Sequence, residues 1–171
     1  MQELKKYYLF PSNLFVEREP YVVTTILGSC VAICLYDPIL KIGGINHYML
    51  PYWNGQGLAS PRYGNIAIER LIERIILLGS KKNNLKAKLF GGAEVIDTHI
   101  SNFHIGERNI AIAIDMLSEY GIPIIAKSIG GKQGRRIEFN TSTGEVRLKY
   151  IQKSDAAELT DFSKKKHQGK V

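Results

Sequence analysis

Cysteine, tryptophan and long apolar stretches are scarce in this chain of 171 residues. It has two cysteines, Cys30 and Cys34, and one tryptophan. No apolar stretch approaches the roughly 20 residues that a membrane-spanning helix needs, and the start of the chain does not resemble a signal peptide. Two unpaired thiols without an export signal favour a reducing compartment. We therefore expect a cytoplasmic protein without disulfides.

Motifs for metal and phosphate binding are also missing. Cys30, Cys34 and His47 would make three metal ligands, but a fourth is lacking and the C-x3-C spacing is not a common zinc motif. The pairs Gly91-Gly92 and Gly130-Gly131 are too short and isolated for phosphate loops, so they indicate sharp backbone turns. We expect no metal ion and no cofactor.

Basic residues outnumber acidic ones and give a net charge of +7. The segment 153–171 contains five lysines and three acids and so contributes +2, which leaves +5 on the rest of the chain. The basic residues are not interleaved with a stacking array of aromatic residues, so nucleic acid is not the expected partner. The charge indicates either a solvated surface or attraction to an acidic partner.

Apolar periodicity predicts about seven strands and two long helices. The two helices are expected at about 62–78 and 107–120, where apolar residues recur at helical spacing. Strands are expected at 21–26, 30–36, 45–50, 86–90, 122–126, 135–140 and 145–150, with the last two forming a hairpin around Thr143-Gly144. The segment 30–36 reads as a strand buried on both faces, and a helix beginning at Ser29 is the alternative. Because the strands come in consecutive groups, the pattern favours an α+β layered domain over a doubly wound one.

The chain divides by composition into one domain and a tail. We expect a single domain over 1–152. The segment 153–171 is polar and lysine-rich, and we expect it to be flexible.

The residue with the clearest potential for catalysis is Cys30, whose thiol lies in an unusual setting. Gly28 and Ser29 form a tight polar turn before Cys30, and His47 lies on the next predicted strand. A thiol close to an imidazole is typical of a cysteine hydrolase, in which the thiolate–imidazolium form supplies the nucleophile. The bland alternative is a buried structural cysteine, which suits Cys34, among apolar neighbours, better than Cys30.

A third group should orient the imidazole, and backbone N–H groups should stabilise the oxyanion of a tetrahedral intermediate. Thr24 and Thr25 are both candidates for the orienting group, and the pattern does not choose between them because the turn at Gly28 breaks the strand parity. The N–H donors are available from the turn formed by Gly28, Ser29 and Cys30. The other histidines, in polar or tail contexts, are weaker candidates for the base: His99, His104 and His167.

Six motifs together resemble the chemoreceptor glutamine deamidase family, CheD. The resemblance covers roughly 21–149, and its two most specific motifs are those around Cys30 and His47. The motifs are L-G-S-C-V-A-I-C-L-Y-D, G-G-I-N-H-Y-M-L-P, R-Y-G-N-I-A-I-E, A-K-L-F-G-G-A, I-G-E-R-N and G-R-R-I-E-F-N-T-S-T-G-E-V.

The resemblance implies a cysteine-dependent protein-glutamine glutaminase that converts glutamine side chains of methyl-accepting chemotaxis receptors to glutamate. It implies Cys30 as nucleophile, His47 as base and Thr24, six residues before the cysteine, as the orienting group. It also implies a layered α/β sandwich that resembles bacterial toxin deamidases. The implied partners are receptor cytoplasmic helices, through which alone the protein would approach the membrane, and the CheC phosphatase.

One position departs from the family pattern. The family usually has an acid two residues before the second Gly-Gly pair, where this chain has Ser128. This departure bears on substrate or partner contacts rather than on the catalytic trio. Two other functions remain open at this point: a non-catalytic adaptor that binds receptor or CheC, and a cysteine peptidase that uses the same trio.

Overall fold

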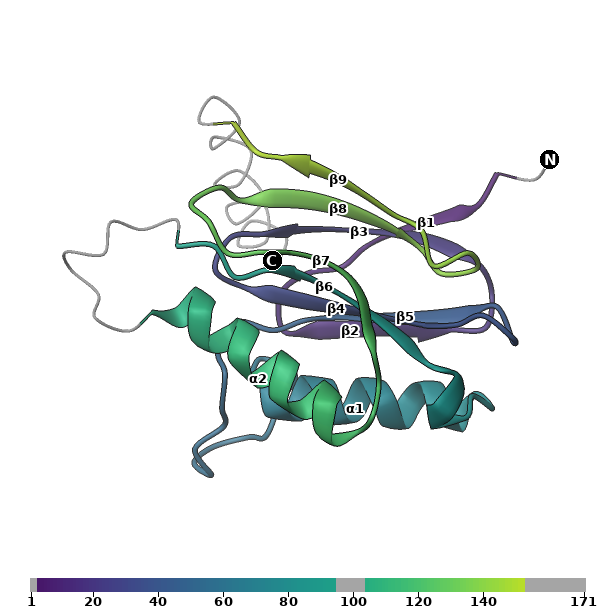
Figure 1. The fold of residues 1–171 in the computed structure, drawn as a ribbon, viewed down its shortest axis with the longest axis horizontal. Helices are drawn as coiled ribbons and strands as arrows, with labels where there is room; N and C mark the ends of the chain where they lie inside the picture. Colours follow the sequence, from purple (N-terminus) through teal and green to yellow (C-terminus); the bar gives the residue numbers. More distant parts are fainter. Residues whose placement is uncertain (1–2, 95–103, 153–171) are drawn as a thin grey trace, which may run out of the picture.

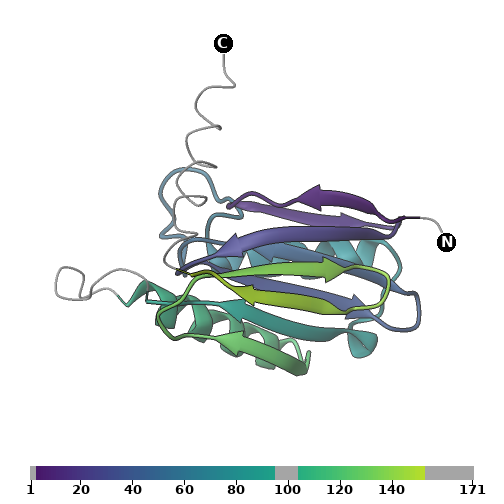
Figure 2. The same cartoon turned by 90° about the horizontal axis from the view of Figure 1, so that it is seen from above.

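Three layers make up the computed structural model, which describes residues 3–94 and 104–152. A four-stranded sheet lies over a five-stranded sheet, and two helices cover the other face of the five-stranded sheet (Figure 1). Figure 2, seen from above, shows the four-stranded sheet in front and the helices behind. The central sheet is therefore buried on both faces.

The five-stranded sheet has the order β2-β5-β4-β6-β7 and mixes parallel with antiparallel pairs. Only β6 and β7 pair in parallel; the other neighbours are antiparallel. Its central strand β4 is almost entirely buried, which explains why its sequence is a continuous apolar run instead of an alternating one. The strands are β2 (Asn13–Glu17), β4 (Val31–Asp37), β5 (Ile42–His47), β6 (Lys86–Gly91) and β7 (Ile124–Ile129).

The four-stranded sheet has the order β1-β3-β8-β9 and covers one face only. Along β3 the buried and half-buried residues alternate, as expected for a strand with one face on the core. The first strand pairs with β3 in parallel, and the last two form the antiparallel hairpin. The strands are β1 (Lys5–Tyr8), β3 (Tyr21–Leu27), β8 (Arg135–Asn140) and β9 (Val146–Tyr150).

Helices α1 (Gly64–Leu77) and α2 (Ile105–Glu119) each bury one apolar stripe against the central sheet, and a short 3-10 turn spans Lys82–Asn84. Two hydrophobic clusters result, one between helices and sheet and one between the two sheets. The second cluster includes Cys34 and, at its margin, Cys30. The two thiols therefore face the layer between the sheets.

The predicted α+β layered sandwich with two long helices is confirmed, and so are the predicted strands and the hairpin. The helix that was the alternative at Ser29 is wrong, because β4 begins at Val31. Two strands were missed, β1 and β2; both are short edge strands whose partners lie elsewhere in the sequence. No helix in the described ranges is long and apolar enough to cross a membrane. The tail 153–171 lies outside the described residues.

Truncation of the buried stripe of α1 tests the helix–sheet core. Leu71 is fully buried in this cluster, whereas Leu77, on the same helix, is 81% exposed. Leu71→Ala should lower the free energy of unfolding by about 2–5 kcal/mol, because it removes buried methyl groups and leaves a cavity. Leu77→Ala should change it by less than about 0.5 kcal/mol. Urea unfolding of both variants measures the difference, and equal losses would contradict this packing.

Candidate active site

The turn Gly28-Ser29-Cys30 connects the two sheets, since β3 ends just before it and β4 begins just after it. Two of its carbonyls are fixed by the backbone that follows β6. The amide of Ala93 donates to the Gly28 carbonyl over 3.0 Å, and the amide of Gly92 donates to the Cys30 carbonyl over 2.9 Å. The two residues that follow β6 thus fix the turn that carries the Cys30 thiol.

A glycine at position 91 makes this close approach possible. Gly91 has a φ of +103°, and a Cβ atom there would overlap the Cys30 carbonyl. Only glycine meets both requirements without strain. All four residues of the pairs Gly91-Gly92 and Gly130-Gly131 have positive φ, although Gly91 is still paired within β6.

Strand register brings Cys30 and His47 to the same face of the central sheet. Val31 pairs with Tyr48 in an antiparallel bridge, so Cys30 lies opposite Met49, and His47 is two residues further along that strand. Diagonal neighbours of this kind have Cα atoms about 7–8 Å apart, within reach of long side chains. The fold therefore places the predicted nucleophile and the predicted base on one face as diagonal neighbours.

The pairing of β4 with β5 is interrupted beside His47. The continuous ladder begins at the Cys34–Ile45 pair, and between that pair and the Val31–Tyr48 bridge the amide of Ile33 donates to the side-chain Oδ1 of Asn46 over 2.8 Å. A side chain thus replaces a backbone acceptor. His47 lies next to this break.

A hydrogen-bond chain fixes the His47 ring. The Thr25 hydroxyl lies 2.7 Å from His47 Nδ1, and it donates to the Leu9 carbonyl over 2.7 Å. A carbonyl only accepts, so the single hydroxyl proton points to Leu9, and Oγ1 accepts from a protonated Nδ1. In the neutral ring this leaves Nε2 without a proton. His47 is thereby held in the tautomer that accepts a proton at Nε2.

The second nitrogen of the ring, Nε2, is buried and has no hydrogen-bond partner in the described part of the chain. His47 as a whole is 1% exposed. Burial lowers the pKa of His47 to about 4, and burial raises the pKa of Cys30 to about 11, partly opposed by the backbone N–H of Cys30 itself. Both shifts favour uncharged forms at neutral pH. Burial thus works against the expected thiolate–imidazolium pair in the resting site.

The hydrogen bond to His47 comes from Thr25, and the expectation for Thr24 does not fit this geometry. Neighbouring residues of a strand point to opposite faces. Thr25 is fully buried with Val23 and Leu27 on the inner face of β3, while Thr24 is on the outer face and only half-buried. The backbone carbonyl of Thr24 accepts from the Leu9 amide over 2.8 Å. Thr24 thus helps to position Leu9, and its link to the His47 ring runs through Leu9 and Thr25.

Asn109 is the residue that sequence reasoning missed. It lies on α2, is fully buried, and its side-chain amide donates to the Ser29 carbonyl over 3.0 Å and to the Met49 carbonyl over 2.9 Å. The signal was available, because Asn109 follows Gly106 by three residues on the buried stripe of the helix, where an apolar residue is the norm. A polar residue at such a position indicates a specific partner.

Of the other histidines, only His104 lies within the described residues. His104 precedes α2, is largely exposed, and lies 3.9 Å from the Glu107 carboxylate. His99 and His167 lie outside the described residues. Among the described residues no cluster of three metal-ligating side chains occurs.

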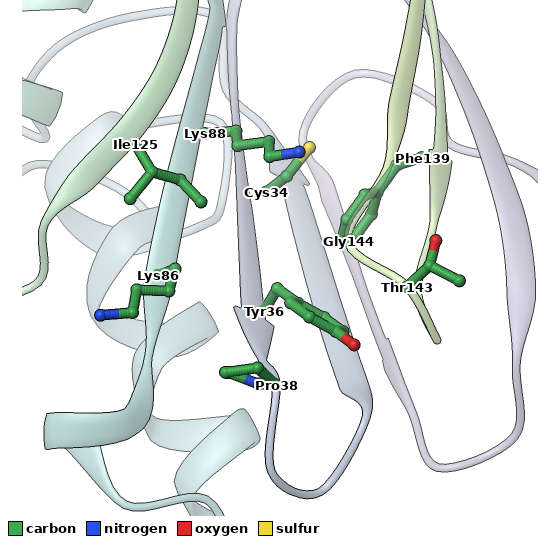
Figure 3. A pocket seen from close by; sticks show the side chains of 9 residues that line it. All are labelled: Cys34, Tyr36, Pro38, Lys86, Lys88, Ile125, Phe139, Thr143 and Gly144. Carbon is green, nitrogen blue, oxygen red and sulfur yellow. The ribbon is translucent and has the colours of Figure 1, made fainter.

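Cys34 occupies a different environment from Cys30. It is 1% exposed, and burial raises the pKa of its thiol, with a small opposing effect from Lys88. It lines a cleft of about 310 Å³ between the sheets, toward the far end of β4 (Figure 3). In that view Lys88 points toward the Cys34 sulfur from the neighbouring strand, with Phe139 across the cleft. Cys34 is therefore a core residue.

Ser128, where the family pattern has an acid, bonds to a buried guanidinium. Arg135 is 1% exposed, and its Nη1 donates to the Ser128 hydroxyl over 2.9 Å. The same guanidinium donates to the carbonyls of Gly130 and Gln133 and stacks on the Tyr150 ring. In the described part of the chain Arg135 has no carboxylate partner. Backbone carbonyls and Ser128 bind Nη1 and Nη2 instead, whereas the buried Nε has no hydrogen-bond partner among the described residues.

Comparisons with known proteins agree on one family. The family profile described as "CheD chemotactic sensory transduction" matches residues 49–150. A probable chemoreceptor glutamine deamidase CheD of Trichlorobacter lovleyi is 50% identical over 145 residues, which is 85% of this chain and 90% of that protein. A protein of the same name from Sulfurimonas denitrificans is 49% identical over 154 residues, 90% of this chain and 99% of its own length. A third, from Rhodospirillum rubrum, is 39% identical over 163 residues, 95% of this chain and 92% of its own.

The low pKa of His47 predicts a loss of stability in acid. The unfolded state binds a proton at about pH 6.5 and the folded state only at about pH 4, so stability falls as the pH drops through this window. The His47 contribution amounts to at most about 3 kcal/mol. Urea unfolding of the wild type and of His47→Gln between pH 7.5 and 4 measures it. The variant should show the smaller decline, and parallel curves would contradict the buried neutral ring.

Proposed function

The chain belongs to the CheD family, and from this premise we propose that it is a chemoreceptor glutamine deamidase in which Cys30 is the nucleophile, His47 the general acid and base, and Thr25 the orienting residue. The observation that carries the proposal is the hydrogen-bond chain from Leu9 through Thr25 to His47. It leaves Nε2 as a proton acceptor on the face that Cys30 shares. A purely structural histidine has no need of such an arrangement.

The first half of the reaction transfers the acyl group to the enzyme. The Cys30 sulfur attacks the side-chain amide carbon of a glutamine while its proton moves to His47 Nε2. The carbonyl oxygen becomes an oxyanion, which the N–H groups of the turn Gly28-Ser29-Cys30 stabilise. His47 then gives the proton to the departing nitrogen. Ammonia leaves, and a thioester remains on Cys30.

The second half releases the product. Water attacks the thioester carbon and gives a proton to His47 Nε2. The carbon–sulfur bond breaks, the proton returns to the sulfur, and the glutamine has become glutamate. The ring needs Nδ1–H throughout, because Nε2 must carry and release the proton. The Thr25 hydroxyl is suited to this task, since its own proton is committed to Leu9.

Burial gives this pair a low resting reactivity. Because burial raises the pKa of Cys30 and lowers that of His47, the thiolate forms only as the proton moves during attack. Two charges develop in the transition state: a positive charge on the His47 ring when it takes the thiol proton, and a negative charge on the oxyanion. The Thr25 hydroxyl is the partner of the first, and the N–H groups of the turn are the partners of the second. The mechanism therefore resembles that of a serine hydrolase more than that of a preformed ion pair.

The partners follow from the same proposal. The substrates are glutamines on the cytoplasmic helices of methyl-accepting receptors, so the protein acts in the cytoplasm and meets the membrane only through them. CheC phosphatase is a further proposed partner. The net charge of +7 favours encounter with acidic helices.

Peptide mass spectrometry of a receptor cytoplasmic fragment tests the activity. The wild type should convert specific glutamines to glutamates without chain cleavage, and Cys30→Ala should abolish conversion. Cys34→Ala is the matched control, which should lose stability but retain deamidation. Cleaved peptides would indicate a peptidase. Binding of the fragment without any mass change would indicate an adaptor, and activity that persists in Cys30→Ala would exclude this nucleophile.

Substitution of the two neighbouring threonines tests the orienting group. Thr25→Val should lower kcat on the order of 10- to 100-fold, well short of the roughly 10⁴-fold loss seen when the orienting carboxylate of a serine protease is replaced. Thr25→Ser keeps the hydroxyl and should retain most activity. Thr24→Val should have the smaller effect, because it changes a side chain on the outer face of β3. A larger loss at Thr24 than at Thr25 would contradict the register.

A further inference from the structure

We propose that Asn109 is a positioning residue for this reaction, whose amide aims the Cys30 N–H at the oxyanion. The inference rests on the proposed function and adds a residue on α2 to it. Asn109 touches no reacting atom. It acts through the Ser29 carbonyl, which belongs to the same peptide unit as the Cys30 N–H.

Both hydrogens of one side-chain nitrogen are used. Asn109 Nδ2 donates to the Ser29 carbonyl over 3.0 Å and to the Met49 carbonyl over 2.9 Å. Ser29 precedes the nucleophile, and Met49 is the residue that strand register places opposite Cys30. A single buried amide therefore joins the turn to the neighbouring strand.

Peptide geometry converts this contact into an orientation. In a planar trans peptide the carbonyl and the N–H point in opposite directions. When Asn109 pulls the Ser29 carbonyl toward α2, the Cys30 N–H must point away from α2. That N–H and the attacking sulfur belong to the same residue, separated only by Cα and Cβ. It is thus on the side where an oxyanion attached through that sulfur would form.

Asn109 is itself held firmly. The Tyr48 hydroxyl donates to the backbone carbonyl of Asn109 over 2.5 Å. One turn earlier, Gly106 packs directly on the carbonyl of Gly92, where a Cβ atom would overlap it. These contacts fix α2 against the segment that also holds the Cys30 carbonyl.

The carbonyls of Gly28, Ser29 and Cys30 are then all occupied. Ala93 and Gly92 bind the first and third through backbone amides, and only the middle one depends on a side chain. The Ser29–Cys30 peptide plane is therefore the one that a single substitution can release. Its rotation would misdirect the N–H without removing the thiol or the imidazole.

Two reactions of Cys30 separate this role from a general structural one. Acylation by 4-nitrophenyl acetate passes through a tetrahedral oxyanion, whereas alkylation by iodoacetamide is a direct displacement that needs only the thiolate. In Asn109→Ala, acylation of Cys30 and kcat for receptor deamidation should both fall about 10- to 100-fold. Alkylation should stay within about threefold of the wild type. Peptide mass spectrometry assigns each adduct to Cys30.

A distant buried hydrogen bond supplies the control. The Ser80 hydroxyl, 4% exposed, donates to the Asp37 carboxylate over 2.7 Å beyond the far end of β4. Ser80→Ala should cost stability without lowering either reaction. If Asn109→Ala fails to fold, Asn109→Asp keeps the side-chain size but supplies one donor at most. In that variant too, acylation of Cys30 should fall while its alkylation stays close to the wild type.

The outcomes are distinct. Parallel loss of acylation and alkylation, or no loss of either, would overturn the role of Asn109. Because acylation needs no receptor, this result stands even if the receptor fragment is not deamidated. Failure of the wild type to deamidate the fragment would count against the proposed function alone.

Discussion

The hydrogen bond between Thr25 and His47 is the contact on which the proposed chemistry depends, because it joins the two sheets at the site. Thr25 belongs to the four-stranded sheet and His47 to the five-stranded one. Displacement of one sheet relative to the other would break this bond and allow the ring to rotate or to change tautomer. The core between the sheets therefore maintains the active-site geometry as well as stability.

The segment between β1 and β2 completes this arrangement. Leu9 accepts from the Thr25 hydroxyl, and the amide of Ser12 donates to the His47 carbonyl over 2.8 Å. One stretch of chain thus contacts both Thr25 and His47, the proposed orienting residue and base, as it passes from one sheet to the other. Two short edge strands, β1 and β2, hold this stretch in register.

Desolvation shapes the site as much as hydrogen bonding does. A buried thiol and a buried imidazole are each more stable uncharged, so the site avoids a permanent buried ion pair. In the proposed mechanism its polar groups are arranged for charges that exist only during turnover: Thr25 Oγ1 accepts from the Nδ1–H of the imidazolium, and the N–H groups of the turn at Cys30 face the oxyanion. Fixed dipoles in a site of this kind need little rearrangement during the reaction. This is the physical reason to expect that Asn109, which only fixes a peptide plane, affects turnover.

Local patterns in the sequence determined much of this protein. A continuous apolar run predicts a strand buried on both faces, stripes at helical spacing predict α1 and α2, and a polar turn before Cys30 with His47 on the next strand predicts a thiol–imidazole pair. Each of these depends on neighbours in sequence. Tertiary structure decided the rest. Thr25 replaces Thr24 beside His47 because the inner face of β3 depends on where the second sheet lies, and strand parity could not be counted through the turn at Gly28. The contacts of Leu9 and Asn109 join segments that are 16 and 80 residues apart along the chain. Contacts between such distant segments are difficult to predict from a single sequence. The pKa shifts of Cys30 and His47 follow from burial, which is a property of the assembled layers.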